Sequence, residues 1–155
     1  MIDLSDLIRP EAIAEGLTVA SKKALLQQLA GLAATAYGVD AKEAADALSA
    51  REKLGSTGFG GGIAIPHARL PGLTSIVGAF ALLAKPIDFA AVDDMPVDLV
   101  FALFSPLDAG SDHLKALARV SRRLREPGFI AKLRGAGSRD AIYVLLMQDE
   151  ARDAA

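Results

Sequence analysis

The chain contains two histidines, His67 and His113, and imidazole is the side chain whose ordinary pKa lies closest to physiological pH. His67 follows Pro66 and the short apolar run 63–65, directly after a glycine-rich segment. Loops that follow strands carry functional residues disproportionately often, so the position favours a reactive histidine. The alternative is an ordinary histidine on a surface loop.

His113 falls in the first turn of a predicted helix that Ser111 or Asp112 would cap. The unpaired N–H groups at a helix N-terminus attract anions, so the position suits a side chain that meets phosphate. The helix field would also lower the imidazole pKa and favour the neutral ring. From the sequence alone, a solvated first-turn histidine is an equally good interpretation.

Two arginines could offer a planar fork of donors to a phosphate or carboxylate: Arg51, near the end of a predicted helix, and Arg69, two residues after His67. Most helical arginines are simply solvated. A further run of arginines is spread around one predicted helix: Arg119, Arg122, Arg123 and Arg125. Without interleaved aromatic residues, this run indicates a solvated or partner-facing basic face rather than an RNA groove.

The glycine-rich segment, residues 55–62, reads GSTGFGGG. A nucleotide-binding phosphate loop would need a lysine that is missing between Gly55 and Arg69, and Ile63 stands where the dinucleotide pattern needs its third glycine. We therefore predict no nucleotide cofactor. Two roles stay open for the segment, namely a tight turn and a close approach by a ligand or a protein partner.

Asp93 and Asp94 are most simply turn residues. Two histidines without any cysteine make a weak case for a metal site, so we predict none.

Helical signals frame these residues. Apolar spacing predicts a helix from Lys22 toward Tyr37, capped by Ser21 and ended by Gly38. A second helix, residues 41 to about 53, would open at Asp40 with a variant capping box. Helical spacing also predicts a helix from about 111 to 124 and a short one from 127 to 133.

Near-continuous apolar runs over 74–84 and 97–104 predict strands covered on both faces, with turn residues at 85–86 and 93–96 between them. The segment 141–147 fits a strand or a terminal helix capped by Ser138 equally well. Because helices alternate with apolar strands, the fold class is an α/β (α+β) sandwich.

The length of 155 residues predicts one domain over 1–155. A net charge of −2 argues against a nucleic-acid partner, and the absence of cysteine fits a reducing cytoplasm. The N-terminus carries acids where a signal peptide needs bases, and the least charged stretch, 70–84, is shorter than a bilayer span. We therefore expect a cytoplasmic protein without membrane insertion.

Residues 51–67, REKLGSTGFGGGIAIPH, closely resemble the signature of the mannitol/fructose-type enzyme IIA family of the bacterial phosphotransferase system. The similarity continues through 96–103, His113-Leu114 and 122–124, so it covers nearly the whole chain. Within the family it is most similar to the nitrogen-regulatory branch. Two positions depart from the usual pattern, since Gly61 replaces a frequent Asn and Ala68 a usual Gly.

The resemblance implies a mixed sheet of about five strands flanked by helices on both faces, and a helix over 138–149. It also implies that His67 accepts a phosphoryl group from the phosphohistidine of an HPr-like carrier protein, and that Arg51 and His113 stabilise that group. No cofactor is implied. His67 must be neutral to attack, and we expect a backbone carbonyl of the glycine-rich segment to hold its other ring nitrogen.

We expect the phosphorylation state to be read by regulatory targets such as sensor kinases or ion-transport proteins. A free-standing chain favours regulation over sugar uptake. The alternatives are a fructose/mannitol-type IIA component acting in trans, and an anion- or protein-binding module without chemical turnover.

Overall fold

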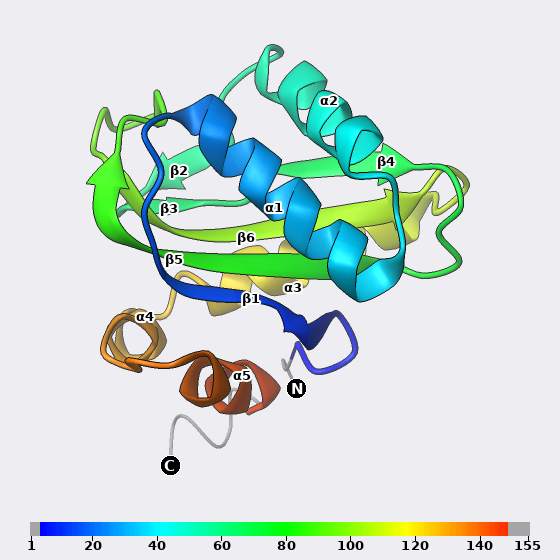
Figure 1. Cartoon of the computed structure of the whole chain (residues 1–155). Coiled ribbons are helices and arrows are strands. Elements are labelled where there is room, and N and C mark those ends of the chain that lie inside the picture. The colour runs from blue at the N-terminus through cyan, green and yellow to red at the C-terminus, as the bar shows by residue number, and fades with distance from the viewer. Residues whose placement is uncertain (1–3, 149–155) are drawn as a thin grey trace.

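A mixed sheet forms the middle layer of the computed structural model, which describes residues 4–148 (Figure 1). Over these residues the sheet has six strands, in the order β1-β5-β6-β3-β2, with β4 paired to β6. The strands are β1 (Ile8–Leu17), β2 (Gly58–Gly60), β3 (Ile63–Ala64), β4 (His67–Leu70), β5 (Val77–Ile87) and β6 (Val97–Pro106). β6 runs parallel to β3 and β4 and antiparallel to β5, which runs parallel to β1. The predicted mixed sheet is confirmed, with six strands instead of about five.

Helices cover both faces of the sheet, as the resemblance implies (Figure 1). Two lie on one face, α1 (Lys22–Tyr37) and α2 (Ala41–Glu52), where α1 contacts β1 and β5 and α2 contacts β4. Three lie on the other face, α3 (Ser111–Arg123), α4 (Pro127–Arg134) and α5 (Arg139–Met147). No helix over residues 4–148 is both long enough and apolar enough to cross a membrane.

Local capping contacts set most helix ends where the sequence predicts them. Ser21 Oγ accepts from the N–H of Ala24 at 3.1 Å, and Asp40 Oδ1 accepts from that of Glu43 at 2.9 Å. Ser138 caps α5 in the same way, so the ambiguous segment 141–147 is helical.

The start of α3 corrects the sequence prediction. Neither Ser111 nor Asp112 caps this helix, because both lie inside it and the N-cap is Gly110, which has no capping side chain. His113 nevertheless stays in the first turn, as expected.

Several strands differ from the sequence predictions. β1 has no predicted counterpart, and β5 continues through Lys85 and Pro86, where the sequence predicts a turn. His67, which the sequence places on a loop after a strand, instead begins the strand β4. Pro86 lies in the stretch between Leu82 and Ile87 where pairing with β6 is irregular, a place where a strand tolerates a residue without an N–H group.

The core lies along β5 and β6. Residues 99–105 of β6 are completely buried, as predicted for a strand covered on both faces. Phe80 and Phe101 meet edge to face across the two strands, with ring centroids 6.3 Å apart. This rigid centre carries β4, because His67 and Ala68 pair in register with Leu103 and Phe104.

Candidate functional site

The fold brings Arg51, His67 and His113 together from three different elements. Arg51 lies in the last turn of α2, His67 begins β4, and His113 lies in the first turn of α3. The two imidazole centroids are 5.5 Å apart, with their planes at 56°. One surface hollow, here called the site hollow, is lined by Ala47, Ala50, Arg51, Leu54, His67, Ala68, Arg69 and His113.

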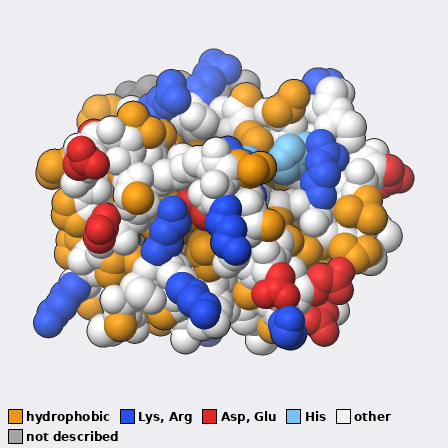
Figure 2. All heavy atoms as spheres, turned by 90° about the horizontal axis from the view of Figure 1, so that it is seen from above, with side chains coloured by type: hydrophobic (Ala, Val, Ile, Leu, Met, Phe, Trp, Pro, Cys, Tyr) orange, Lys and Arg blue, Asp and Glu red, His pale blue; other side chains and the backbone are white. Residues whose placement is uncertain are grey.

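The site hollow opens on the side of the molecule where α1 and α2 lie. Viewed from that side, histidine atoms are visible at the surface, with basic and hydrophobic side chains around them (Figure 2). His67 is half-buried and Arg51 partly exposed. Arg69 is exposed, and its guanidinium lies 3.5 Å from the carbonyl oxygen of Gly110. A ligand or protein partner can therefore reach the imidazole of His67 from solvent.

The contacts of His67 specify its tautomer. Its Nδ1 lies 2.9 Å from the carbonyl oxygen of Ile65, which can only accept, so Nδ1 carries the proton. Its Nε2 lies 3.3 Å from Nε of Arg51, which can only donate, so Nε2 carries a lone pair. A backbone carbonyl holds the ring as expected, but it belongs to Ile65, just beyond the glycine-rich segment.

The surroundings of His67 keep its imidazole neutral. Burial is the main cause that lowers the pKa of His67 below its ordinary value of 6.5, and the charge of Arg51 lowers it further. The Ile65 carbonyl and Glu52 act in the opposite direction without reversing the shift. At neutral pH the lone pair on Nε2 is therefore available as a nucleophile.

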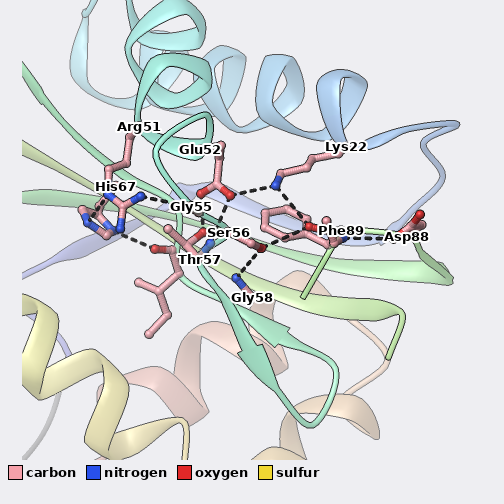
Figure 3. A network of polar contacts seen from close by, with 12 residues as sticks. Lys22, Arg51, Glu52, Gly55, Ser56, Thr57, Gly58, His67, Asp88 and Phe89 are labelled. Carbon is pink, nitrogen blue, oxygen red and sulfur yellow. Dashed lines mark hydrogen bonds and ion pairs between the residues drawn. The ribbon is translucent and has the colours of Figure 1, made fainter. Parts of the chain in front are cut away.

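Arg51 is held beside His67 by the start of the glycine-rich segment. Its Nη1 donates to the carbonyl oxygen of Gly55 at 2.9 Å, while Nε faces His67 (Figure 3). The guanidinium therefore places a cation directly beside Nε2 of His67.

The next residue, Glu52, enters a buried polar network (Figure 3). Its carboxylate accepts from the N–H of Thr57 at 3.1 Å and from the Thr57 hydroxyl, and it forms an ion pair with Lys22 at 2.9 Å. The carbonyl of Thr57 accepts in turn from the N–H of Ile65, whose own carbonyl holds His67. Glu52 is therefore linked to His67 through Thr57 and Ile65, and it is the neighbour of Arg51 in the chain.

Neither Glu52 nor Lys22 is among the site residues that the sequence predicts. A signal was available, because Ala44, Leu48 and Glu52 follow one another at four-residue intervals and form the buried face of α2. A charged residue on an apolar stripe needs a partner. The sequence does not say that the partner is Lys22 of another helix.

His113 is less exposed to solvent than His67, with 8% of its surface exposed. Its Nδ1 lies 2.5 Å from Oγ of Ser105, a fully buried residue of β6. Burial lowers the pKa of His113 below 6.5, and the neighbouring His67 and Arg69 lower it further. The predicted direction is right, and burial is its main cause.

Two members of the arginine run depart from the solvated or partner-facing basic face that the sequence predicts. Arg123 is completely buried, with its guanidinium 3.6 Å from the ring centroid of Phe129 and its Nη1 on the carboxylate of Glu126. Arg119 forms an ion pair with Asp6 at 2.6 Å.

Asp93 acts as a turn residue, as predicted, and accepts from the N–H of Met95 at 3.1 Å. It also accepts from the N–H of Gly61 at 3.0 Å, which ties the turn to the glycine-rich segment. Among residues 4–148, His, Asp and Glu side chains nowhere form a group of three or more able to hold a metal ion.

Comparisons with known proteins point in one direction. Residues 6–149 match the family described as "Phosphoenolpyruvate-dependent sugar phosphotransferase system, EIIA 2". A nitrogen regulatory protein of Bradyrhizobium diazoefficiens is 50% identical over 143 residues, which cover 92% of this chain and 94% of the relative. A fructose-specific EIIA component of Haloferax volcanii is 37% identical over 147 residues, covering 94% and 96%.

Solved structures agree with the sequence relatives. The nitrogen regulatory protein IIA-Ntr of Neisseria meningitidis superposes with a TM-score of 0.85 at 31% identity, covering 92% of this chain and 98% of that one. The mannitol IIA of Escherichia coli, at 21% identity and a TM-score of 0.74, covers 89% and 97% and shares the fold.

Proposed function

The chain belongs to the EIIA type 2 family of the phosphoenolpyruvate-dependent sugar phosphotransferase system, and we propose that it carries the phosphoryl group of this system on Nε2 of His67. It is a nitrogen-regulatory, phosphoryl-relay component of that system. One observation carries the assignment of the residue: His67 Nδ1–H is held by the Ile65 carbonyl while the lone pair of Nε2 faces Arg51 in the site hollow.

The proposed step exchanges one P–N bond for another. Nε2 of His67 attacks the phosphorus of a phosphohistidine on an HPr-like carrier, and the carrier's imidazole leaves with the electron pair of the broken bond. Nδ1 of His67 keeps its proton, and the Ile65 carbonyl stabilises the positive charge that develops on the ring.

Arg51 must change its contact during this step. Its Nε–H occupies the lone pair that attacks, so the guanidinium moves from Nε2 to the phosphoryl oxygens as the new bond forms. His113 supplies a second donor at the same place. Positioning and neutralisation of charge account for most of the catalysis in phosphoryl transfer, and Arg51 and His113 supply both in this proposal.

Phosphorylation would add a charge of about −1.5 to −2 to the exposed face around the site hollow, by analogy with other phosphorylated side chains. Such a change repels acidic partners and attracts basic ones. In this proposal the two states of the protein act differently on regulatory targets such as sensor kinases or ion-transport proteins. The cytoplasmic location and the single domain over 1–155 remain predictions that accompany it.

The assignment of His67 is tested by incubating the protein with a phosphorylated HPr-like carrier. We expect an acid-labile, alkali-stable mass increase that disappears in His67→Ala. His113→Ala and Arg51→Ala should still be labelled, at lower rates, because they assist the transfer without forming the bond. Labelling of His67→Ala at the wild-type rate would show that another residue accepts the group.

A second candidate function is sugar-specific phosphoryl transfer, since the H. volcanii relative is a fructose-specific EIIA component. The two functions differ in the next acceptor. Incubating the phosphorylated protein with fructose- and mannitol-type IIB proteins separates them, and we expect no transfer from a regulatory protein. Rapid transfer to a IIB protein would favour the sugar function.

A pure binding module without turnover would be favoured by a histidine hidden behind the glycine-rich segment. His67 instead lines the open site hollow.

A further inference from the structure

The proposed step leaves open which nitrogen of His113 carries its proton, and Ser105 bears on that question. Ser105 lies near the end of β6, is completely buried, and places its hydroxyl 2.5 Å from Nδ1 of His113. Either atom of this contact can act as the donor, since a hydroxyl and a neutral imidazole each offer one proton and one acceptor.

Burial decides between the two arrangements. Within residues 4–148, Nδ1 of His113 is the hydrogen-bond partner of the Ser105 hydroxyl, and no second one is found. If Nδ1 held the proton and donated it, the hydroxyl hydrogen would be buried without an acceptor, which is energetically unfavourable. If the hydroxyl donates to Nδ1, both groups are satisfied. Ser105 Oγ–H is therefore the donor, and the proton of neutral His113 resides on Nε2.

The two histidines of the site hollow then have opposite tautomers. In His67, Nδ1 carries the proton and Nε2 the lone pair, because Ile65 and Arg51 hold the ring. In His113 the hydroxyl of Ser105 imposes the reverse. One ring thus offers a nucleophile and the other offers a proton donor, at a centroid separation of 5.5 Å.

Building on the proposed function, we propose that Ser105 is a positioning residue that fixes His113 as a neutral Nε2–H donor to the phosphoryl oxygens. The same contact prevents His113 Nε2 from acting as a competing nucleophile. It also disfavours the imidazolium form, whose Nδ1–H would again leave the buried hydroxyl hydrogen without an acceptor. Ser105 therefore separates the roles of two neighbouring imidazoles.

The first test reads the tautomers directly, by ¹⁵N NMR of the imidazole rings in the unphosphorylated protein at neutral pH. We expect a protonated Nε2 in His113 and a protonated Nδ1 in His67. A protonated Nδ1 in wild-type His113 overturns the inference, whatever the phosphorylation experiments give. This measurement needs no variant, so it does not depend on whether a substitution at a buried position folds.

The second test uses the matched pair Ser105→Thr and Ser105→Val, which differ by one hydroxyl group at nearly equal volume. We expect Thr to retain the Nε2–H tautomer of His113 and Val to give a mixture of tautomers, while His67 is unchanged in both. Transfer from the phosphorylated carrier should be about five- to tenfold slower in Val than in Thr, as for one hydrogen bond. Ser105→Ala should resemble Val, and it serves if the larger side chains perturb folding.

The outcomes separate this inference from the proposed function. Equal tautomers and equal transfer rates in Thr and Val overturn the role of Ser105, while His67 remains the acceptor as long as His67→Ala is not labelled. Labelling of His67→Ala instead overturns the proposed function, and the tautomer measurements then still report whether Ser105 sets the state of His113.

Discussion

The two halves of the glycine-rich segment are held by different kinds of contact. Residues 55–58 are held by the buried carboxylate of Glu52, which accepts from Thr57 and pairs with Lys22 (Figure 3). Residues 60–62 form a surface turn held by two charged side chains: Asp93 accepts from the N–H of Gly61, and Arg134 donates to its carbonyl at 2.9 Å.

The first half of the motif is therefore held rigidly, whereas the second half can vary. The first half connects the core to Arg51 and, through Thr57 and Ile65, to His67, so changes there reach the site. The second half projects from the sheet beside β3, and changes there alter the surface that a partner meets. Substitutions in residues 55–58 should therefore reduce stability or activity more than substitutions in residues 60–62.

The largest effect is expected from Glu52→Ala. Its side chain is 5% exposed, so the substitution removes a buried ion pair and the acceptor of the Thr57 N–H. We expect the free energy of unfolding to fall by about 3 kcal/mol, near the lower limit for such pairs because Lys22 can still reach water. Urea denaturation measures this change. Asp46→Ala, on the exposed side of the same helix, is the matched control and should unfold like the wild type.

Gly58→Ala should come next. A Cβ atom at this position would lie 2.8 Å from Cβ of Ala91 and 3.1 Å from its Cα, so the backbone around Ala91 would have to shift. We expect a loss of about 2 kcal/mol, typical of overpacking a close contact. Thermal unfolding with a measured enthalpy tests it, and a variant as stable as the wild type would contradict the rigid contact that we describe.

A change of pH should have a smaller effect on stability, through the imidazole of His67. The pKa of His67 is lowered in the folded protein, mainly by burial, so between 6.5 and that lowered value the unfolded chain binds more protons. This contribution to stability is present above pH 6.5 and is lost as the pH falls through that window. His113, whose pKa is also lowered, acts in the same direction.

Stability measured from pH 7.5 to 5.5 checks this sign. The decline should be shallower in His67→Ala, which lacks one of the two groups. A wild-type protein that gains stability on acidification through this window would show that the histidines are not destabilised as cations.

The smallest effect is expected from Gly61→Asn, which restores the residue frequent in the family. Gly61 has a φ of +68°, in the left-handed region that Asn tolerates, and a Cβ there would meet nothing within 4 Å. We expect stability and phosphoryl transfer from the carrier to stay near wild-type values. Gly61→Val is the contrasting variant, since a β-branched residue is strained at this φ. If Gly61→Asn is as destabilised as Gly61→Val, the turn does not have the open space for a side chain that we describe at Gly61.

The sequence by itself determined the features that depend on neighbouring residues. Ser21, Asp40 and Ser138 cap helices because their acceptors lie three residues from the N–H groups they bind. The contact between Ile65 and His67 also spans only two residues, although the sequence predicts a carbonyl of the glycine-rich segment in its place. For the same reason the boundaries of α1, α2 and α4 lie within about two residues of the predicted ones.

The sequence does not predict correctly which face of α3 is buried. The apolar spacing includes Leu114, which is 67% exposed, whereas the buried side of the helix carries His113, Ala116, Val120 and Arg123. A guanidinium that stacks on Phe129 and pairs with Glu126 can occupy a core position that a pattern assigns to solvent. Periodicity locates the helix, but its rotation is set by these contacts with other parts of the chain.

Only the tertiary structure decided the chemistry of the site. Arg51, His67 and His113 come from α2, β4 and α3, and the sheet brings them together because β4 and β6 pair in register. The protonated nitrogen of each ring depends on whether a carbonyl, a guanidinium or a hydroxyl faces it, and two of those groups come from other elements. An imidazole can donate or accept at either nitrogen, so its role is fixed by its neighbours in space rather than by its position in the chain.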